Sequence, residues 1–130
     1  MAQSPATQTL LSTLGIEVTE QTAERVVARM PVGPAVMQPF GLLHGGASVA
    51  LAETVASMAA WMNVDRGRYN VVGIEINANH LRAVREGVVT GVALPVNIGR
   101  RIQVWEVRVT DEQGKLVCIS RCTVAVVPKE

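Results

Sequence analysis

One segment restricts the fold of this chain more than any other: residues 45–62 are almost all small or apolar, and Glu53 is the only charged residue among them. The segment has the length and composition of a long helix that begins at His44 or Gly45 and ends at Met62. A helix on the surface of a protein carries a polar stripe, whereas this one is apolar on nearly every face. We therefore expect other elements to enclose it.

The segments on either side of this helix have the residue types and turn signals of β-strands. Before it, we expect a short helix ended by Gly15, two strands and a glycine- and proline-rich loop, at residues 8–14, 15–20, 25–32 and 33–43. After it, we expect four strands joined by turns, at residues 69–81, 87–99, 100–111 and 116–127. These four strands are expected to form an antiparallel meander that wraps around the helix, which gives an α+β fold. In the first of them, the alternation predicts one shared face for Val72, Ile74, Ile76 and Ala78.

Length and charge limit the kind of protein this can be. The 130 residues fit one domain, 1–130, and a net charge of +1 gives no electrostatic reason to expect a nucleic-acid or membrane-surface partner. The N-terminus has no basic and apolar leader, and the glutamate in the long helix argues against a membrane span. Cys118 and Cys122 stand four apart in a strand, roughly 13 Å, which is beyond the reach of a disulfide. Because the two cysteines cannot bridge each other, we expect a reduced, cytoplasmic protein. They also lack a nearby histidine, so we expect no metal site, and we expect no cofactor.

Glu53 is the first candidate for a functional residue. It lies far from the first turn of the helix, where a carboxylate would favour the helix dipole, and no cation stands three or four residues away. A carboxylate that loses water without gaining a partner is costly, which favours a role in a site. The alternative is a helix side that reaches the surface, or a pairing with a distant arginine.

Gly45 and Gly46 are the second candidate. The first N–H groups of a helix have no partner, and without a Cβ a substrate carbonyl could approach them closely. Such donors stabilise a developing oxyanion. The alternative is a tight turn into the helix.

The spacing of these candidates favours a site made by two chains. His44 and Glu53 are nine residues apart, which along a helix means opposite faces and a rise of roughly 13 Å. One small reacting group could meet both only if the helix start of one chain faced the middle of the helix of another. Ser57 lies one turn after Glu53 on the same face and could hold the carboxylate or a water molecule.

The segment QPFGLLHGGASVALAETVAS, residues 38–57, resembles the signature of hotdog-fold acyl-CoA thioesterases of the PaaI type. Within that group it is most similar to the glutamate-using branch of 4-hydroxybenzoyl-CoA thioesterases. Residues 76–126 resemble the sheet of the family, so the resemblance covers most of the chain after about residue 13. It implies a single hotdog domain, in which an antiparallel sheet wraps around one long central helix.

The resemblance also implies a role for each residue of the motif. Glu53 would be the catalytic carboxylate, as nucleophile or general base, and the Gly45 N–H would polarise the thioester carbonyl. His44 and Gln38 would position the thioester or the attacking water, and Ser57 would support that water. In this family the glutamate faces the glycine and the glutamine of the partner subunit, so a homodimer is the smallest active unit and two dimers form a homotetramer.

The phosphates of coenzyme A require local positive charge on a nearly neutral protein. By resemblance, Arg82, Arg100 and Arg101 lie where family members meet the nucleotide end of the ligand, and Arg85 is a further candidate. The alternative for each arginine is ordinary solvation at the end of a strand. His80 is expected to be a packing residue.

The branch favours aromatic acyl groups, and Phe40, Met58 and Trp61 are the candidates for their pocket. Two other functions remain open. A non-catalytic acyl-CoA-binding or regulatory module would not need Glu53, and a hydratase for enoyl thioesters usually has an Asp/His pair, whereas the start of the helix offers no Asp.

Overall fold

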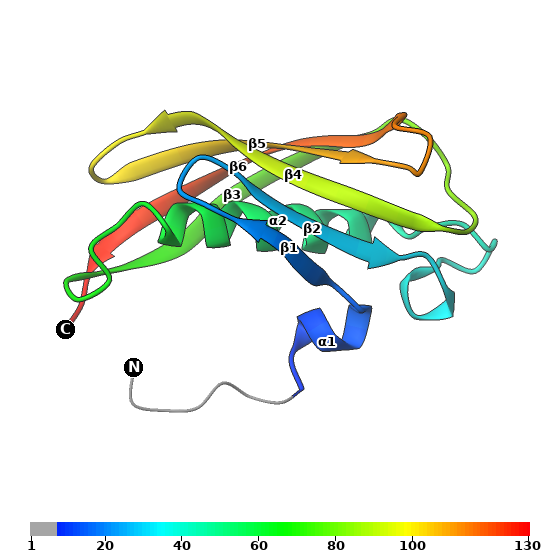
Figure 1. The fold of residues 1–130 in the computed structure, drawn as a ribbon, viewed down its shortest axis with the longest axis horizontal. Helices are drawn as coiled ribbons and strands as arrows, with labels where there is room; N and C mark the ends of the chain where they lie inside the picture. Colours follow the sequence, from blue (N-terminus) through cyan, green and yellow to red (C-terminus); the bar gives the residue numbers. More distant parts are fainter. Residues whose placement is uncertain (1–7) are drawn as a thin grey trace.

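The computed structural model describes residues 8–130, in which a six-stranded antiparallel sheet covers one long helix (Figure 1). The elements in chain order are α1 (Leu10–Leu14), β1 (Glu17–Gln21), β2 (Val26–Pro31), the 3-10 helix η1 (Pro34–Val36), α2 (Gly45–Trp61), β3 (Tyr69–His80), β4 (Val88–Ile98), β5 (Ile102–Thr110) and β6 (Leu116–Pro128). Both expected helices and all six expected strands are present. α1 begins two residues later than expected, after Thr9, and ends at Gly15 in the left-handed conformation, with φ of 74°.

The order of the strands in the sheet is β1-β2-β4-β5-β6-β3, so the expected meander of the last four strands is wrong in part. β4, β5 and β6 form a meander, but β3 pairs with β6 at the edge, and β2 takes the place beside β4. The reason lies in residues 81–87, which run past the start of α2 and do not form a hairpin. The Leu43 N–H donates to the carbonyl of Val84 at 2.8 Å, which ties this connection to the loop before α2.

Small side chains let α2 lie close to the sheet. Its buried residues include Leu51, Ala52, Val55 and Ala56, and the helix contacts every strand from β2 to β6. A Cβ on Gly91 of β4 would lie 3.1 Å from Leu51 Cγ, so the glycine lets Leu51 pack against β4 without displacement.

A buried polar pair ties the last turn of α2 to β5. The Trp105 ring N–H donates to Gln103 Oε1 at 2.8 Å, and Gln103 Nε2 donates to the carbonyl of Ala60 at 3.4 Å. Both side chains are almost fully buried, so these hydrogen bonds satisfy groups that water cannot reach.

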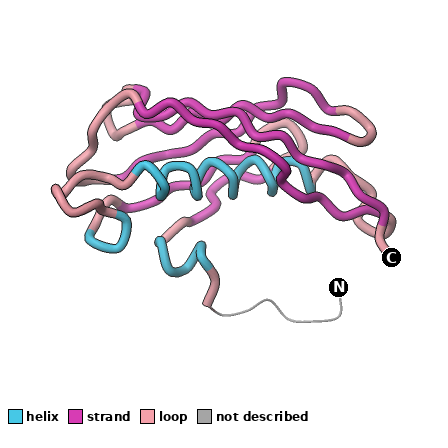
Figure 2. Tube along the Cα trace, turned by 180° about the vertical axis from the view of Figure 1, so that it is seen from behind, coloured by secondary structure: helices cyan, strands magenta, loops and turns pink. Residues whose placement is uncertain are grey.

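The sheet covers only one side of α2. Figure 2 shows the helix against the concave side of the sheet, with no strand across its opposite side. Glu53 is exposed and Ala50, Thr54, Ser57 and Met58 are only half-buried. The expected enclosure is therefore incomplete within one chain, and the uncovered side is the side that carries the glutamate. None of the helices in residues 8–130 has the length and hydropathy that a membrane crossing requires.

β3 departs from regular alternation. Its register against β6 slips between Gly73 and Glu75, and Ile74 is the extra residue of this bulge. As a result Ile76 packs on the core, whereas Val72 and Ile74 are 49% and 57% exposed. The prediction of one shared face for these residues is wrong, because one extra residue in a strand reverses the faces that follow it.

Cys118 and Cys122 are free and buried, on β6. Burial raises the pKa of both thiols, and for Cys122 the pKa rises to about 11. The negative charges of Glu53 and Glu75 add to the effect of burial on Cys122. The Glu53 carboxylate is thus close enough to β6 for its charge to raise the pKa of the buried Cys122 thiol.

The raised pKa of Cys122 predicts a loss of stability in alkali. The ordinary pKa of the thiol is 9.0. Below this pH the thiol keeps its proton in both the folded and the unfolded protein, so its contribution to the free energy of unfolding is fully present. Between this pH and the folded pKa of about 11, the unfolded chain loses the proton first, so the free energy of unfolding should fall. The slope of this fall approaches about 1.4 kcal/mol of unfolding free energy per pH unit. Chemical denaturation across this range should give a smaller slope for Cys122→Ala, and equal slopes in both proteins would contradict the assignment.

Candidate active site

The N-terminus of α2 presents one backbone donor without a partner. His44 caps the helix, because its Nδ1 accepts from the Gly46 N–H at 2.8 Å. The Ala47 N–H donates to the carbonyl of His44 at 3.0 Å. Within residues 8–130, no acceptor lies within hydrogen-bonding distance of the Gly45 N–H. This group is therefore available to an oxygen atom of a ligand.

The Gly45 N–H borders a hollow of about 480 Å³, which we call the glycine hollow. Its polar lining residues are Gln38, Ser48, His80 and Arg82, and leucine, alanine and valine side chains complete it. The ring of His80 stands directly against Gly45, since a Cβ at this position would lie 2.9 Å from His80 Nε2. A Cβ at this position would therefore require the His80 ring to move away.

Gln38 has a fixed orientation at the edge of the glycine hollow. Its Oε1 accepts from the N–H groups of Phe40 and Leu42, in the loop before α2. The oxygen of the carboxamide is therefore held by the backbone, and the NH₂ group is left to donate to a ligand.

Glu53 lies in a second hollow of about 520 Å³, on the uncovered side of α2, which we call the glutamate hollow. It is lined by Glu53, Ser57, Ala50, Thr54 and Met58 of α2 and by Leu10 and Leu11 of α1. Glu53 has no hydrogen bond or ion pair to any other of the described residues. Its carboxylate reaches β3, where a Cβ on Gly73 would lie 2.8 Å from Oε2. The glycine at the start of the bulge leaves the space that the carboxylate occupies.

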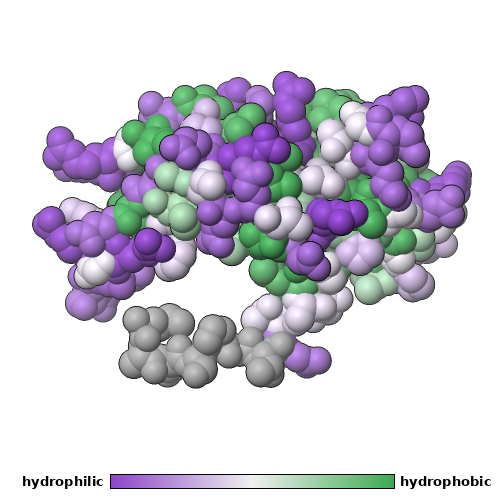
Figure 3. Space-filling view, in the orientation of Figure 1, coloured by the Kyte–Doolittle hydropathy of each residue, from purple (hydrophilic) through white to green (hydrophobic). Residues whose placement is uncertain are grey.

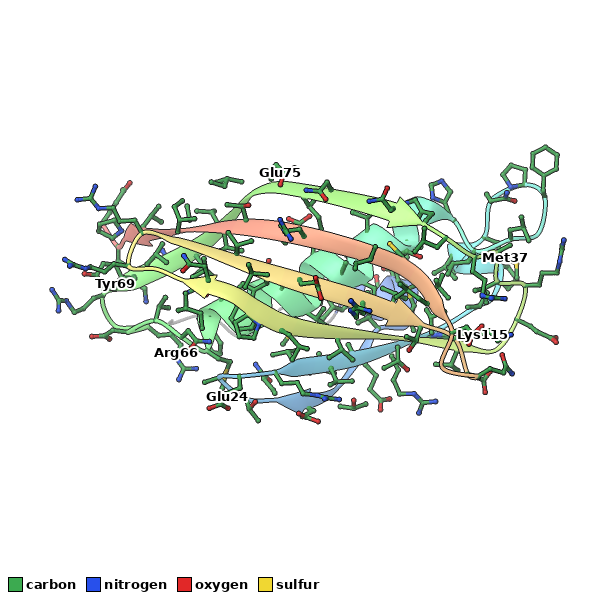
Figure 4. All side chains as sticks on the ribbon, turned by 90° about the horizontal axis from the view of Figure 1, so that it is seen from above. Glu24, Met37, Arg66, Tyr69, Glu75 and Lys115 are labelled. Atoms are coloured by element: carbon green, nitrogen blue, oxygen red, sulfur yellow. The ribbon has the colours of Figure 1, made fainter. Side chains whose placement is uncertain are left out.

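The two hollows share no lining residue, so one chain does not bring all the predicted residues together. Gln38, Gly45 and Arg82 line the glycine hollow, whereas Glu53 and Ser57 line the glutamate hollow. Figure 4 shows how far the elements extend: Met37, near the start of α2, lies at the opposite end of the molecule from Arg66 and Tyr69, which follow the helix.

The predicted arginines also lie in two separate places. Figure 3 shows hydrophilic side chains at both ends of the molecule and between them. Arg82 lies at the end of β3 in the glycine hollow. Arg100 and Arg101 are exposed in the turn between β4 and β5. This turn lies near the start of β3, because the Val126 N–H donates to the carbonyl of Arg101 and Val126 pairs with Val71.

Of the residues expected around the acyl group, only Met58 lines the glutamate hollow. Phe40 is 84% exposed in the loop before α2. The ring of Trp61 lies under the guanidinium group of Arg66, with 4.2 Å from Cζ to the ring centroid. Arg85 lines neither hollow.

Several residues of the two hollows are missed by reasoning from sequence. His80, which we expect from the sequence to be only a packing residue, is exposed and lines the glycine hollow. Ser48 is 1% exposed and also lines the glycine hollow. Its position one turn after Gly45 could have identified it from the sequence, because residues three apart lie on the same face of a helix. Leu10 and Leu11 come from a helix whose place beside α2 depends on the fold of the whole chain.

Residues 40–118 match the model of the thioesterase superfamily. The 1,4-dihydroxy-2-naphthoyl-CoA hydrolase of Listeria monocytogenes is 48% identical over 120 residues, which cover 92% of this chain and 97% of that protein. The proofreading thioesterase EntH of Cronobacter turicensis is 51% identical over 118 residues, which cover 91% of this chain and 85% of the relative.

A solved structure agrees with these relatives. A mutant thioesterase of Pseudomonas aeruginosa superposes with a TM-score of 0.92 at 44% identity, and the match covers 98% of both chains. The hotdog fold expected from the sequence is thus confirmed, as is the expected class of enzyme. The chain belongs to the thioesterase superfamily and is a hotdog-fold hydrolase of thioesters.

Proposed function

We propose that this enzyme hydrolyses acyl-CoA thioesters with aromatic or hydroxyaromatic acyl groups, at a site shared by two copies of the chain. One observation carries the proposal: the carboxylate and the free backbone donor that hydrolysis needs lie in separate hollows of one chain. The Listeria relative, named for a naphthoyl-CoA substrate, supports coenzyme A and an aromatic acyl group. The free, buried cysteines are in keeping with a reducing compartment such as the cytoplasm.

The edge strand β3 offers a way to join the two hollows. It is twelve residues long and lies at the margin of the sheet, so its outer backbone groups can pair with another strand. Glu53 lies against Gly73 and Gly45 lies against His80, seven residues further along the same strand. Antiparallel pairing of two β3 strands, with Gly73 opposite the partner's His80, would bring Glu53 to the partner's Gly45. Two-fold symmetry then makes two such sites in each dimer.

The same pairing would unite the divided arginines. It moves the start of β3, beside Arg101, towards the partner's Arg82, where both could meet the phosphates of one coenzyme A molecule. We expect two dimers of this kind to form a homotetramer.

In the proposed reaction, the thioester carbonyl oxygen accepts from the Gly45 N–H and from the NH₂ group of Gln38. These donors stabilise the negative charge that grows on this oxygen as the carbonyl carbon is attacked. Glu53 of the other protomer either removes a proton from the attacking water or attacks the carbon itself. In the second case the anhydride that forms is then hydrolysed by water. In both cases the carbon–sulfur bond breaks, and coenzyme A leaves as a thiolate that takes up a proton.

Replacement of the Glu53 carboxylate should stop the reaction without unfolding the protein. Glu53→Gln removes the base or nucleophile, so kcat should fall by about 10²- to 10⁴-fold. The melting temperature should change little, because the side chain is exposed and makes no hydrogen bond within residues 8–130. The test is release of free thiol from benzoyl-CoA, with Glu24→Gln, another exposed glutamate, as the matched control. Normal turnover in Glu53→Gln would refute the proposal.

Two inactive variants should restore activity when they are combined. In a mixed dimer of Glu53→Ala and Gln38→Ala chains, one site receives the intact Glu53 and the intact Gln38, and the other site receives neither. Random pairing should therefore recover about a quarter of the wild-type activity. The chains are unfolded together and refolded, and each variant refolded alone serves as the control. A mixture no more active than its components would show that each site belongs to one chain.

His44 should act through the structure of the helix start. His44→Ala removes the cap on Gly46 and should lower the free energy of unfolding by about 1 kcal/mol. It should also lower kcat, because the Gly45 N–H loses its fixed direction. His44→Asn, which can also cap, should recover the stability. Denaturation and thiol-release assays of both variants test this, and an unchanged stability in His44→Ala would be contrary to the capping role.

A further inference from the structure

The wall of the glutamate hollow that faces α2 comes from the short helix α1. Leu10 and Leu11 of α1 lie across the hollow from Ala50 and Met58 of α2. The position of α1 is fixed at its C-terminal end, where the Ile16 N–H donates to the carbonyl of Leu11 at 2.8 Å. Leu11 and Leu14 pack against the core, whereas Leu10 is 57% exposed. Leu10 therefore contributes to the hollow without supporting the core.

The polar groups that residues 8–130 contribute to this hollow are few, and they include no cation. Glu53, Thr54 and Ser57 are its only polar lining residues within the described part of the chain. The Thr54 hydroxyl is occupied, because it donates to the carbonyl of Ala50 at 2.7 Å. The hollow thus has an apolar wall, one free hydroxyl and one carboxylate.

From this we infer that α1 forms the selective wall of the acyl pocket: Leu10 and Leu11 favour neutral, apolar acyl groups and disfavour acyl groups that end in a carboxylate. The inference rests on the proposed function, because it takes the acyl group to lie beside Glu53. A second carboxylate there would lose water and face Glu53, and residues 8–130 of the same chain supply no cation to this hollow. A neutral ring or chain would instead cover Leu10, Leu11 and Met58 and remove their apolar surface from water.

Leu10 is the residue with which to test this wall, since it is exposed and outside the core. The experiment measures kcat/KM for benzoyl-CoA and for glutaryl-CoA, whose acyl group ends in a carboxylate, in the wild type and in Leu10→Ala and Leu10→Arg. Leu94→Ala and Leu94→Arg are the matched controls, because Leu94 is also exposed but lines neither hollow.

We expect the wild type to prefer benzoyl-CoA. Leu10→Ala should lower kcat/KM for benzoyl-CoA by about tenfold, through lost apolar contact. Leu10→Arg should shift the ratio of the two substrates towards glutaryl-CoA by about tenfold or more, because it supplies the missing cation. The Leu94 variants should keep the wild-type ratio.

The outcomes separate the inference from the proposed function. If the wild type hydrolyses benzoyl-CoA but the Leu10 variants keep the substrate ratio of their Leu94 counterparts, the wall is not selective and the inference is overturned while the function stands. A wild type that hydrolyses benzoyl-CoA but prefers glutaryl-CoA also overturns the inference alone. A wild type that releases no thiol from either substrate overturns the proposed function, and the inference with it.

Discussion

The packing of α2 against the sheet is the contact on which the rest of the molecule depends. Alanine, valine and leucine side chains on one side of the helix, together with Gly91 on β4, bring the two layers close enough to exclude water. This packing fixes the direction of the helix. It therefore also fixes where the free Gly45 N–H points and on which side Glu53 emerges. The positions of the two hollows are therefore a consequence of how this helix packs against its sheet.

The sheet covers α2 on one side only, and the proposed function depends on the side left open. The helix composition demands cover on nearly every face, yet the six strands leave the side of Glu53 open. A second copy of the chain is the natural cover in the proposed dimer, where it would also supply the donor that Glu53 needs. The same surface would then serve both assembly and catalysis.

Local patterns in the sequence were sufficient for the elements but not for their arrangement. The long helix, the strands and the bare helix start follow from composition and periodicity, and the rise between His44 and Glu53 already indicates that one chain keeps these two residues apart. The position of β3 beside β6 depends on how residues 81–87 cross the start of α2, which no local pattern encodes. The bulge at Ile74 and the contact of His80 with Gly45 depend in turn on that placement. Contacts between residues far apart in the sequence therefore limit how much of the strand arrangement can be predicted from local patterns.

The bulge has one more consequence, which concerns what selection can change at Gly73. Glycine weakens a strand, and an alanine there would ordinarily make β3 firmer. The missing methyl group, however, is the room in which the Glu53 carboxylate lies. An alanine at this position would therefore displace the Glu53 carboxylate from where it now lies. The absence of a side chain at Gly73 therefore helps to determine where the Glu53 carboxylate lies.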